Sequence, residues 1–183
     1  MNLPNKISLA RIFLIPVVMF FYLATFFPAG KIIATIIYVI AASTDFVDGM
    51  IARRTNQVTN LGKFLDESAD KLLTTSILLM LLASNIMDTV FGVVSVFSIL
   101  ARDQIVGFIR RLAVKKNIVI AADKLGKIKT IILDISLALL MIIAINDDMK
   151  IFANIKPFEI FTFVVFGIGL IMNIVSGVNY VVK

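Results

Sequence analysis

Four aspartates lie close together in otherwise apolar sequence: Asp45, Asp48, Asp66 and Asp70. They form the pattern D-x2-D-G-x2-A-R-x8-G-x3-D-x3-D. An aspartate at the centre of a bilayer costs about 2.5–3.5 kcal/mol on insertion scales, so four of them need compensation. Such carboxylates bind cations or line a wet cavity, and either use indicates function.

The spacing of these aspartates predicts two facing acidic stripes. Asp45 and Asp48 are three residues apart and Asp66 and Asp70 are four apart, and residues at these spacings share a helix face. We expect the two helices to form an antiparallel hairpin across the polar loop 54–60. The hairpin would bring all four carboxylates to one depth.

Carboxylates gathered in this way suit divalent cations. Cysteine and histidine are both absent, so a metal must be bound by oxygen, which favours Mg²⁺, Mn²⁺ or Ca²⁺. Two cations about 3.5–4 Å apart form the usual site for displacement at phosphorus. A carboxylate at the edge of the cluster can take a proton from an incoming hydroxyl, and Asp70 is the candidate base.

Small residues accompany the aspartates on both stripes. Gly49 and Ala52 continue the stripe of Asp45, and Gly62 precedes Asp66 by four residues. Small side chains on a helix face let a backbone or a flat ligand approach closely. A helix-packing seam explains Gly49 or Ala52 equally well when either is taken alone. The structural alternative for the aspartates is salt bridges to nearby bases: Arg53, Arg54, Lys63 and Lys71.

The composition of the chain predicts a polytopic membrane protein. Of its 183 residues, 60% are hydrophobic and the mean hydropathy is +1.00, whereas soluble domains are about 45–50% apolar. We expect one all-α transmembrane catalytic domain over residues 1–183, with six helices near the ~20 residues that cross a bilayer. The expected spans are about 7–27, 32–52, 64–83, 89–112, 128–145 and 158–182.

The basic residues predict the orientation in the cell membrane. With six spans, both termini share the side that carries most of the 18 Lys and Arg residues, and only Lys31, Lys150 and Lys156 fall on the other. The positive-inside rule makes the basic side cytoplasmic, so the acidic cluster opens to that leaflet. We attribute the net charge of +6 to membrane orientation and to the binding of anionic ligands. Nucleic acid is not an expected partner.

Bases in the second half of the chain predict a phosphate site. Arg102 lies inside an apolar segment at a depth similar to Asp70, and Arg110 lies on roughly the same side of that segment. Lys127 and Lys129 open the next segment. Guanidinium groups suit bidentate phosphate binding, so we expect these four bases to face the acidic cluster. Interface anchoring is the preferred interpretation for three others: Lys115, Lys116 and Lys124.

The four-aspartate pattern resembles the signature of the CDP-alcohol phosphotransferase family, and every fixed position of that signature is present. The resemblance covers the whole chain. It implies a fold of six transmembrane helices, usually a homodimer, with the active site in the cytoplasmic leaflet.

The resemblance also implies a role for each aspartate. Asp45 and Asp66 correspond to carboxylates that bridge two divalent cations, Mg²⁺ or Mn²⁺, and Asp48 corresponds to a ligand of the first ion. Asp70 corresponds to a ligand of the second ion and to the base that activates the acceptor alcohol.

The CDP-lipid site is implied in the same way. Gly49, Arg53 and Thr59 fall where the family contacts the CDP group. Asn5 lies in a segment, with Ser8 and Arg11, that resembles the family's P-N-x-x-T-x-x-R element, with Ser8 in place of the usual Thr. The expected CDP-lipid-binding set is completed by two small residues: Ala52 and Gly62.

The acceptor follows from two further elements, R-D-x6-R and G-K-x-K-T. They resemble bacterial members of the family that use glycerol 3-phosphate. The resemblance implies that CDP-diacylglycerol and sn-glycerol 3-phosphate give phosphatidylglycerophosphate and CMP, in membrane lipid synthesis. Asp103 stands where many relatives have Glu, with Arg102 or Arg111 as its expected partner. Asp134 is expected to pair internally with a nearby base.

Three alternatives remain open. The same fold could use another acceptor: inositol phosphate, serine or phosphatidylglycerol. Aromatic prenyltransferases also use aspartate-rich motifs, but as two well-separated motifs in longer chains. A cation transporter would also carry intramembrane acids, although no repeat of the aspartate segment is found, and cation flux into liposomes without CDP-lipid would favour that class.

Overall fold

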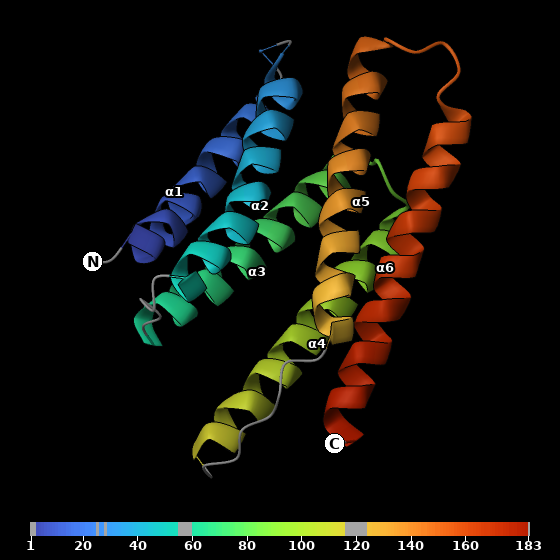
Figure 1. Ribbon diagram of the computed structural model, residues 1–183. Coiled ribbons are helices and arrows are strands. Elements are labelled where there is room, and N and C mark those ends of the chain that lie inside the picture. The colour runs from blue at the N-terminus through green and yellow to red at the C-terminus, as the bar shows by residue number, and fades with distance from the viewer. Residues whose placement is uncertain (1–2, 25, 28, 55–59, 116–123, 183) are drawn as a thin grey trace.

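The computed structural model describes residues 3–24, 26–27, 29–54, 60–115 and 124–182. Side chains are described for these residues apart from 3–4, 45–54, 60–61, 63, 114–115, 124–125 and 181–182. The described residues form six α-helices and no β-strand, which confirms the predicted all-α fold (Figure 1). The helices are α1 (Leu3–Leu23), α2 (Gly30–Arg54), α3 (Asn60–Ala83), α4 (Thr89–Lys115), α5 (Lys124–Met149) and α6 (Lys156–Val182).

Several of these helices can cross a membrane. Among the described residues, four segments are long and apolar enough: Asn5–Leu23, Thr89–Ala113, Gly126–Met149 and Lys156–Tyr180. The chain is therefore a multi-pass membrane protein. In α2 the described apolar segment is the shorter Gly30–Thr44, and α3 carries acidic residues in its first half. The prediction of six spans stays a prediction for these two helices.

The outward faces of the helices are apolar, as lipid contact requires. Large side chains such as Phe97 (72% exposed) and Ile160 (66% exposed) point away from the protein interior. The fully buried side chains include Tyr38, Leu137 and Phe166. Burial of this apolar core joins helices that are distant in the sequence.

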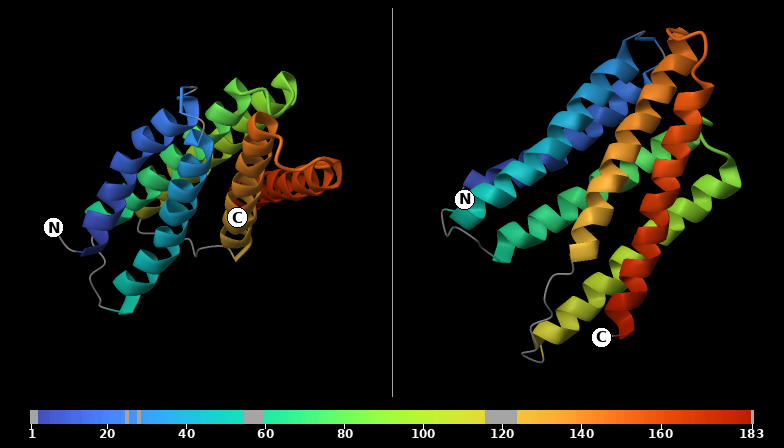
Figure 2. Two further views of the ribbon diagram at one scale, coloured as in Figure 1. Left: turned by 90° about the horizontal axis from the view of Figure 1, so that it is seen from above. Right: turned by 45° about the vertical axis from the view of Figure 1, so that its right-hand side comes forward.

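The helices run up and down, so alternate connections lie at the same end of the molecule. Both termini lie toward one end, together with the starts of α3 and α5 (Figures 1 and 2). α1 packs against α2 and α3, and α6 packs against α4 and α5. α5 also contacts α2 and α3, and α3 contacts α4. α3, which carries Asp66 and Asp70, therefore adjoins α4 and α5, which carry the predicted phosphate-binding bases.

The first helix ends earlier than predicted. The sequence predicts a span to Phe27, whereas α1 ends at Leu23. Phe27 precedes a proline, and a residue in that position disfavours helical backbone angles. The chain turns instead through a backbone hydrogen bond from Gly30 to Phe27 (2.9 Å). A Cβ at Gly30 would collide with the Phe21 carbonyl oxygen, so this turn requires glycine.

Candidate active site

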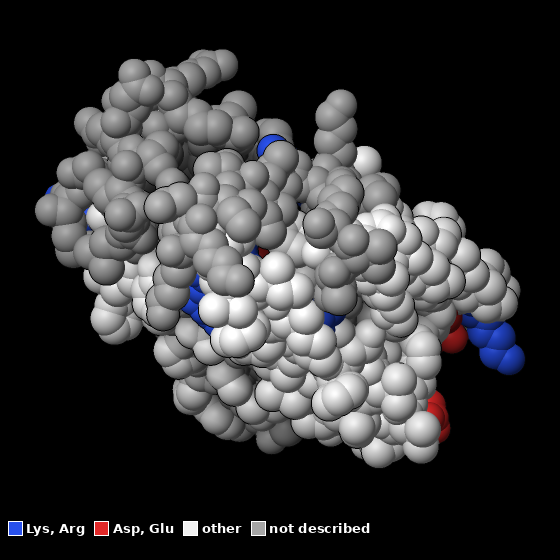
Figure 3. Space-filling model, turned by 90° about the horizontal axis from the view of Figure 1, so that it is seen from below, with Lys and Arg blue, Asp and Glu red and all other residues white. Residues whose placement is uncertain are grey.

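A cavity of about 800 Å³ lies among helices α2 to α6. Its charged lining residues come from three helices: Asp66, Glu67, Asp70 and Lys71 from α3, Arg102, Asp103 and Arg110 from α4, and Lys127, Lys129 and Asp134 from α5. In a view of the molecule from below, parts of basic side chains and a trace of an acidic one show in recesses of this face (Figure 3). The cavity thus brings opposite charges to one place inside an apolar helical protein.

One edge of the cavity, the acidic edge, consists of Asp66 and Asp70. They lie one turn apart on α3, and both line the cavity. Arg11 of α1 is 2% exposed, and its Nη1 lies 3.4 Å from Asp66 Oδ1. The packing of α1 against α3 therefore helps to orient this carboxylate.

The other predicted metal ligands, Asp45 and Asp48, lie on the last turns of α2. Their side chains fall outside the described set, as do those of Gly49, Ala52 and Arg53, and Thr59 lies wholly outside it. The preceding turn of α2 contributes described residues to the cavity wall, including Ala42 and Ser43. α2 therefore continues from the wall of the cavity into the segment that carries Asp45 and Asp48.

The two remaining residues of the predicted CDP-lipid set lie near the acidic helix. Asn5 is 5% exposed, in the first turns of α1. Gly62 lies in the first turn of α3 and is half-buried. Neither lines the cavity, so their assignment to the CDP-lipid stays a prediction.

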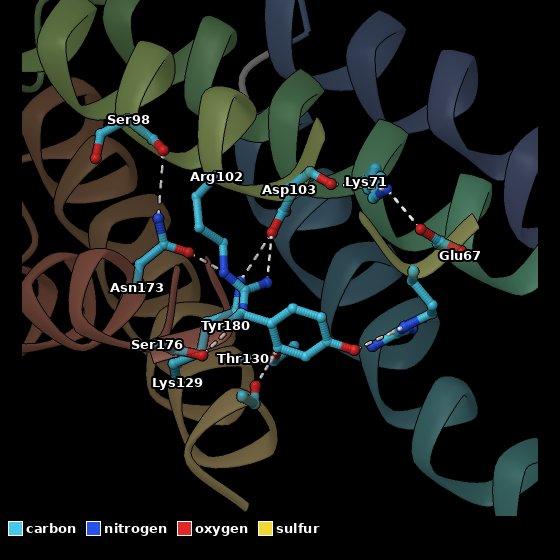
Figure 4. Close-up of polar contacts among 12 residues, drawn as sticks. Glu67, Lys71, Ser98, Arg102, Asp103, Lys129, Thr130, Asn173, Ser176 and Tyr180 are labelled. Atoms are coloured by element: carbon cyan, nitrogen blue, oxygen red, sulfur yellow. Dashed lines mark hydrogen bonds and ion pairs between the residues drawn. The ribbon is translucent and has the colours of Figure 1, made fainter. Parts of the chain in front are cut away.

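Another part of the cavity lining is the basic wall, made of Arg102, Arg110, Lys127 and Lys129. The structure thus brings together the four bases that the sequence singled out, in the same cavity as the acidic edge. Asp103 lies within this wall: its Oδ1 accepts hydrogen bonds from Arg102 Nη1 (2.9 Å) and Lys129 Nζ (3.1 Å) (Figure 4). Four bases against one carboxylate leave the wall net positive.

The partner of Asp103 is now defined. Arg102 is one of the two partners that the sequence suggested, and Lys129 is a second partner that it did not suggest. Asp134 lines the cavity, and its backbone carbonyl accepts a hydrogen bond from Tyr38 (3.2 Å). Its pairing with a nearby base stays a prediction.

A further ion pair lies within α3, and its lysine also contacts α4 at the basic wall. Lys71, considered above as a possible partner of the aspartates, pairs with Glu67 at 2.7 Å. Its Nζ also lies 3.4 Å from the backbone carbonyl of Asp103. Lys71 therefore links α3 to α4 beside the cavity.

Sequence reasoning missed the contribution of α6 to this site. Asn173, Ser176 and Tyr180 of α6 accept hydrogen bonds from members of the basic wall. A signal was present, because these polar residues recur every three or four positions in a strongly apolar helix. Their partners lie on other helices, so the pattern alone did not name them.

The acidic edge fits a hard divalent cation. Carboxylate oxygens are the preferred ligands of Mg²⁺ and Mn²⁺, and Asp66 and Asp70 present them at one edge of the cavity. Among the side chains that the structure describes, no three acidic residues gather into a metal site. Completion of such a site by Asp45 and Asp48 of α2 stays a prediction.

The arrangement suits chemistry on phosphates. A carboxylate can act as a base or a metal ligand at one edge, and guanidinium and ammonium groups can bind a phosphate at the other. A cavity of this volume falls in the range of small-molecule sites.

Comparison with known proteins agrees with chemistry on phosphates. The sequence model of the family described as CDP-alcohol phosphatidyltransferase matches residues 1–175. A Bacillus subtilis protein named CDP-diacylglycerol–glycerol-3-phosphate 3-phosphatidyltransferase is 35% identical, over 100% of this chain and 94% of its own length. A Rickettsia bellii protein of the same name is 32% identical, over 98% of this chain and 93% of its own length. A Salmonella choleraesuis protein of that name is 34% identical over 76% of each chain.

Proposed function

This chain belongs to the CDP-alcohol phosphatidyltransferase family, and we propose that it transfers the phosphatidyl group of CDP-diacylglycerol to sn-glycerol 3-phosphate. The products are phosphatidylglycerophosphate and CMP. Two curated relatives that align with nearly the full length of the chain are named for this reaction. The family resemblance seen in the sequence is thereby confirmed.

One structural observation carries the proposal: the acidic edge and the basic wall line the same cavity. A transfer between two phosphorus-bearing substrates needs both. The diphosphate of the donor is bound where carboxylates and divalent cations meet. The phosphate of the acceptor is bound by guanidinium and ammonium groups, which suit it in geometry and charge.

The donor occupies the α2–α3 side of the cavity. Its acyl chains lie among the exposed apolar side chains of the helices, in the lipid. Its CDP group lies against Gly49, Arg53 and Thr59, with Asn5, Ala52 and Gly62 nearby. Small residues at Gly49, Ala52 and Gly62 allow the flat nucleotide to approach the helix backbone.

The acceptor occupies the α4–α5 side. Arg102, Arg110, Lys127 and Lys129 bind its phosphate, which directs the hydroxyl toward Asp70. Asp70 takes the proton of that hydroxyl, and the oxygen attacks the phosphorus attached to diacylglycerol. The bond from this phosphorus to CMP breaks, and CMP leaves with the electron pair. Positioning and charge neutralisation supply most of the rate enhancement.

Members of this family typically use divalent metals, and Asp45, Asp48, Asp66 and Asp70 are the residues that would hold them here. Two cations, Mg²⁺ or Mn²⁺, would neutralise the diphosphate and stabilise the departing CMP. Arg11 of the neighbouring helix α1 orients Asp66, which holds this carboxylate in position to bind a cation.

The cellular arrangement completes the proposal. The enzyme lies in the cell membrane with both termini and the cavity on the cytoplasmic side, where glycerol 3-phosphate is dissolved. The basic wall and the other bases at this end agree with the positive-inside rule. We also propose that the enzyme works as a homodimer.

An acceptor screen tests the function. Purified protein in vesicles that contain CDP-diacylglycerol is given Mg²⁺ and one labelled acceptor at a time. Glycerol 3-phosphate should give labelled lipid and one CMP per lipid formed. Label from inositol phosphate, serine or phosphatidylglycerol but not from glycerol 3-phosphate would assign a different acceptor.

A further inference from the structure

Helix α6 carries three polar side chains along one side. Asn173, Ser176 and Tyr180 follow one another at spacings of three and four residues, which places them on one helix face. Asn173 and Ser176 are completely buried, and Tyr180 is 6% exposed. Polar groups inside a membrane protein are costly unless they are bonded. Each of these three contacts a different member of the basic wall.

Asn173 holds Lys129. Its Oδ1 accepts a hydrogen bond from Lys129 Nζ at 2.9 Å, and its Nδ2 lies 3.4 Å from the Ser98 carbonyl oxygen on α4 (Figure 4). The second contact turns the amide so that its oxygen faces the ammonium. Lys129 Nζ also donates to Asp103 Oδ1 at 3.1 Å. An ammonium has three donors, so these two bonds orient it and leave one for a ligand.

Ser176 holds Arg102. Its Oγ accepts a hydrogen bond from Arg102 Nη2 at 2.8 Å, and Asp103 Oδ1 accepts one from Nη1 at 2.9 Å. A guanidinium group has five N–H donors in a fixed plane. The two bonds therefore fix its plane and use only two of these donors. Its Nε is buried and has no hydrogen-bond partner among the described residues.

Tyr180 holds Arg110. Arg110 Nε lies 3.5 Å from the tyrosine hydroxyl, and the guanidinium carbon lies 5.9 Å from the centre of the ring. Both contacts are weak, although a cation over an aromatic ring adds attraction. They favour a position of Arg110 at the edge of the cavity, which both residues line.

We propose that Asn173, Ser176 and Tyr180 are positioning residues for recognition of the acceptor phosphate. Through one contact each, they hold Lys129, Arg102 and Arg110 in the orientation that binds the phosphate. A site that is held in its binding geometry loses less side-chain freedom on binding. This inference rests on the proposed function and assigns α6 a part in its substrate specificity.

Ser176→Ala tests the shortest of these contacts, with Ser136→Ala as the matched control. Ser136 is an equally buried serine on α5, and its hydroxyl bonds to the Leu133 carbonyl of its own helix. Loss of a hydrogen bond to a charged group predicts that Ser176→Ala raises KM for glycerol 3-phosphate about tenfold. KM for CDP-diacylglycerol should change less than about twofold, because the donor binds elsewhere. Ser136→Ala should leave both KM values unchanged.

Tyr180→Phe provides a second comparison that keeps the ring and the packing. Tyr22→Phe is its control, because Tyr22 is a buried tyrosine in α1 beside Lys31, away from the basic wall. Tyr180→Phe should raise KM for glycerol 3-phosphate about two- to threefold, in keeping with the longer contact to Arg110. The control should have no such effect.

A double-mutant cycle separates positioning from general loss of packing. If Ser176 acts through Arg102, Ser176→Ala should have little further effect on KM in an Arg102→Gln protein. Independent effects that multiply in the double variant would overturn the inference, as would parallel changes in both KM values.

These results are distinguishable from failure of the proposed function. A wild-type protein that makes no lipid from glycerol 3-phosphate would refute the function itself. An active wild-type protein whose Ser176→Ala and Tyr180→Phe variants keep its KM for glycerol 3-phosphate would refute only the role of α6. Thermal unfolding of each variant, compared with its control, identifies changes that are due to lost stability.

Discussion

Asp70 lies one turn beyond Asp66 on α3, where both carboxylates line the cavity. In the proposed reaction the Asp70 carboxylate accepts the proton of the acceptor hydroxyl. Arg110 lines the same cavity as part of the basic wall, on α4. Single substitutions at these two positions should therefore affect different steps.

Asp70→Asn should lower kcat by at least about 100-fold, because general-base catalysis contributes about 10²–10⁴-fold. The amide keeps the size of the side chain but cannot take the proton. Incorporation of labelled glycerol 3-phosphate measures the loss, and binding of labelled CDP-diacylglycerol should be largely retained. Asp88→Asn is the control, because Asp88 accepts hydrogen bonds from Val90 and Phe91 at the start of α4, and asparagine caps a helix equally well. Full turnover by Asp70→Asn would end its assignment as the base.

Arg110→Ala should raise KM for glycerol 3-phosphate about tenfold or more, with a smaller change in KM for CDP-diacylglycerol. Its guanidinium is proposed to bind only the acceptor, and a hydrogen bond to a charged group contributes about 1.5–3 kcal/mol. Arg111→Ala is the matched control, since Arg111 is the next residue but does not line the cavity. Steady-state kinetics with each substrate varied in turn make the comparison. Equal effects of the two substitutions would remove Arg110 from the phosphate site.

At the scale of elements, α6 contacts the stem of Arg102 directly at Gly177. A Cβ at this position would lie 2.7 Å from Arg102 Cγ, which is too close for any ordinary contact. Gly167 of the same helix has no such neighbour: an added Cβ there meets nothing within 4 Å. The two glycines therefore form a matched pair.

Gly177→Ala should displace Arg102 and raise KM for glycerol 3-phosphate, with little change in KM for CDP-diacylglycerol. Gly167→Ala should leave kinetics unchanged and should not lower the melting temperature, because alanine favours helix by about 1 kcal/mol over glycine. Kinetic assays and thermal unfolding of both variants test this. Wild-type KM in Gly177→Ala would show that the contact with α6 does not set the position of Arg102.

The helices could be predicted from the sequence because long apolar segments need no knowledge of the tertiary structure. The early end of α1 was the exception, since it depends on the turn before Gly30 as well as on the composition of the span. The juxtaposition of the acidic edge and the basic wall was predicted from depth and helix spacing.

Contacts between helices could not be predicted in the same way. The bond from Lys129 to Asp103 depends on how α5 is rotated relative to α4, and the bond from Arg102 to Ser176 depends on the approach of α6. Neither this rotation nor this approach can be deduced from the spacing of residues along one helix. Polar residues in α6 indicated a use for that face, but only the fold identifies Lys129, Arg102 and Arg110 as their partners.

At the scale of the whole molecule, both termini lie toward one end of the helical protein (Figure 1). The cavity is lined by residues near the starts of α3 and α5 and near the end of α6. Lys150, 74% exposed at its side chain, follows α5 at the other end. The absence of cysteine makes single-cysteine labelling direct. Orientation in the membrane can therefore be measured on otherwise unmodified protein.

Lys150→Cys should react with a membrane-impermeant maleimide in intact cells, because the positive-inside rule places it outside. Arg111→Cys, near the cavity end of α4, should react only after the cells are permeabilised. Gel-shift detection of labelled protein makes the measurement, with the cysteine-free wild-type protein as the blank. The reverse pattern of labelling would invert the proposed orientation and place the cavity on the wrong side for a cytoplasmic acceptor.

Diffraction from crystals soaked with Mn²⁺ and glycerol 3-phosphate tests most directly whether the two sides of the cavity have the proposed functions. We predict anomalous density for manganese beside Asp66 and Asp70, and the acceptor phosphate within hydrogen-bond distance of Arg102, Arg110 and Lys129. Manganese bound away from the acidic edge, or a phosphate bound away from the basic wall, would contradict the proposed division of the cavity between donor and acceptor.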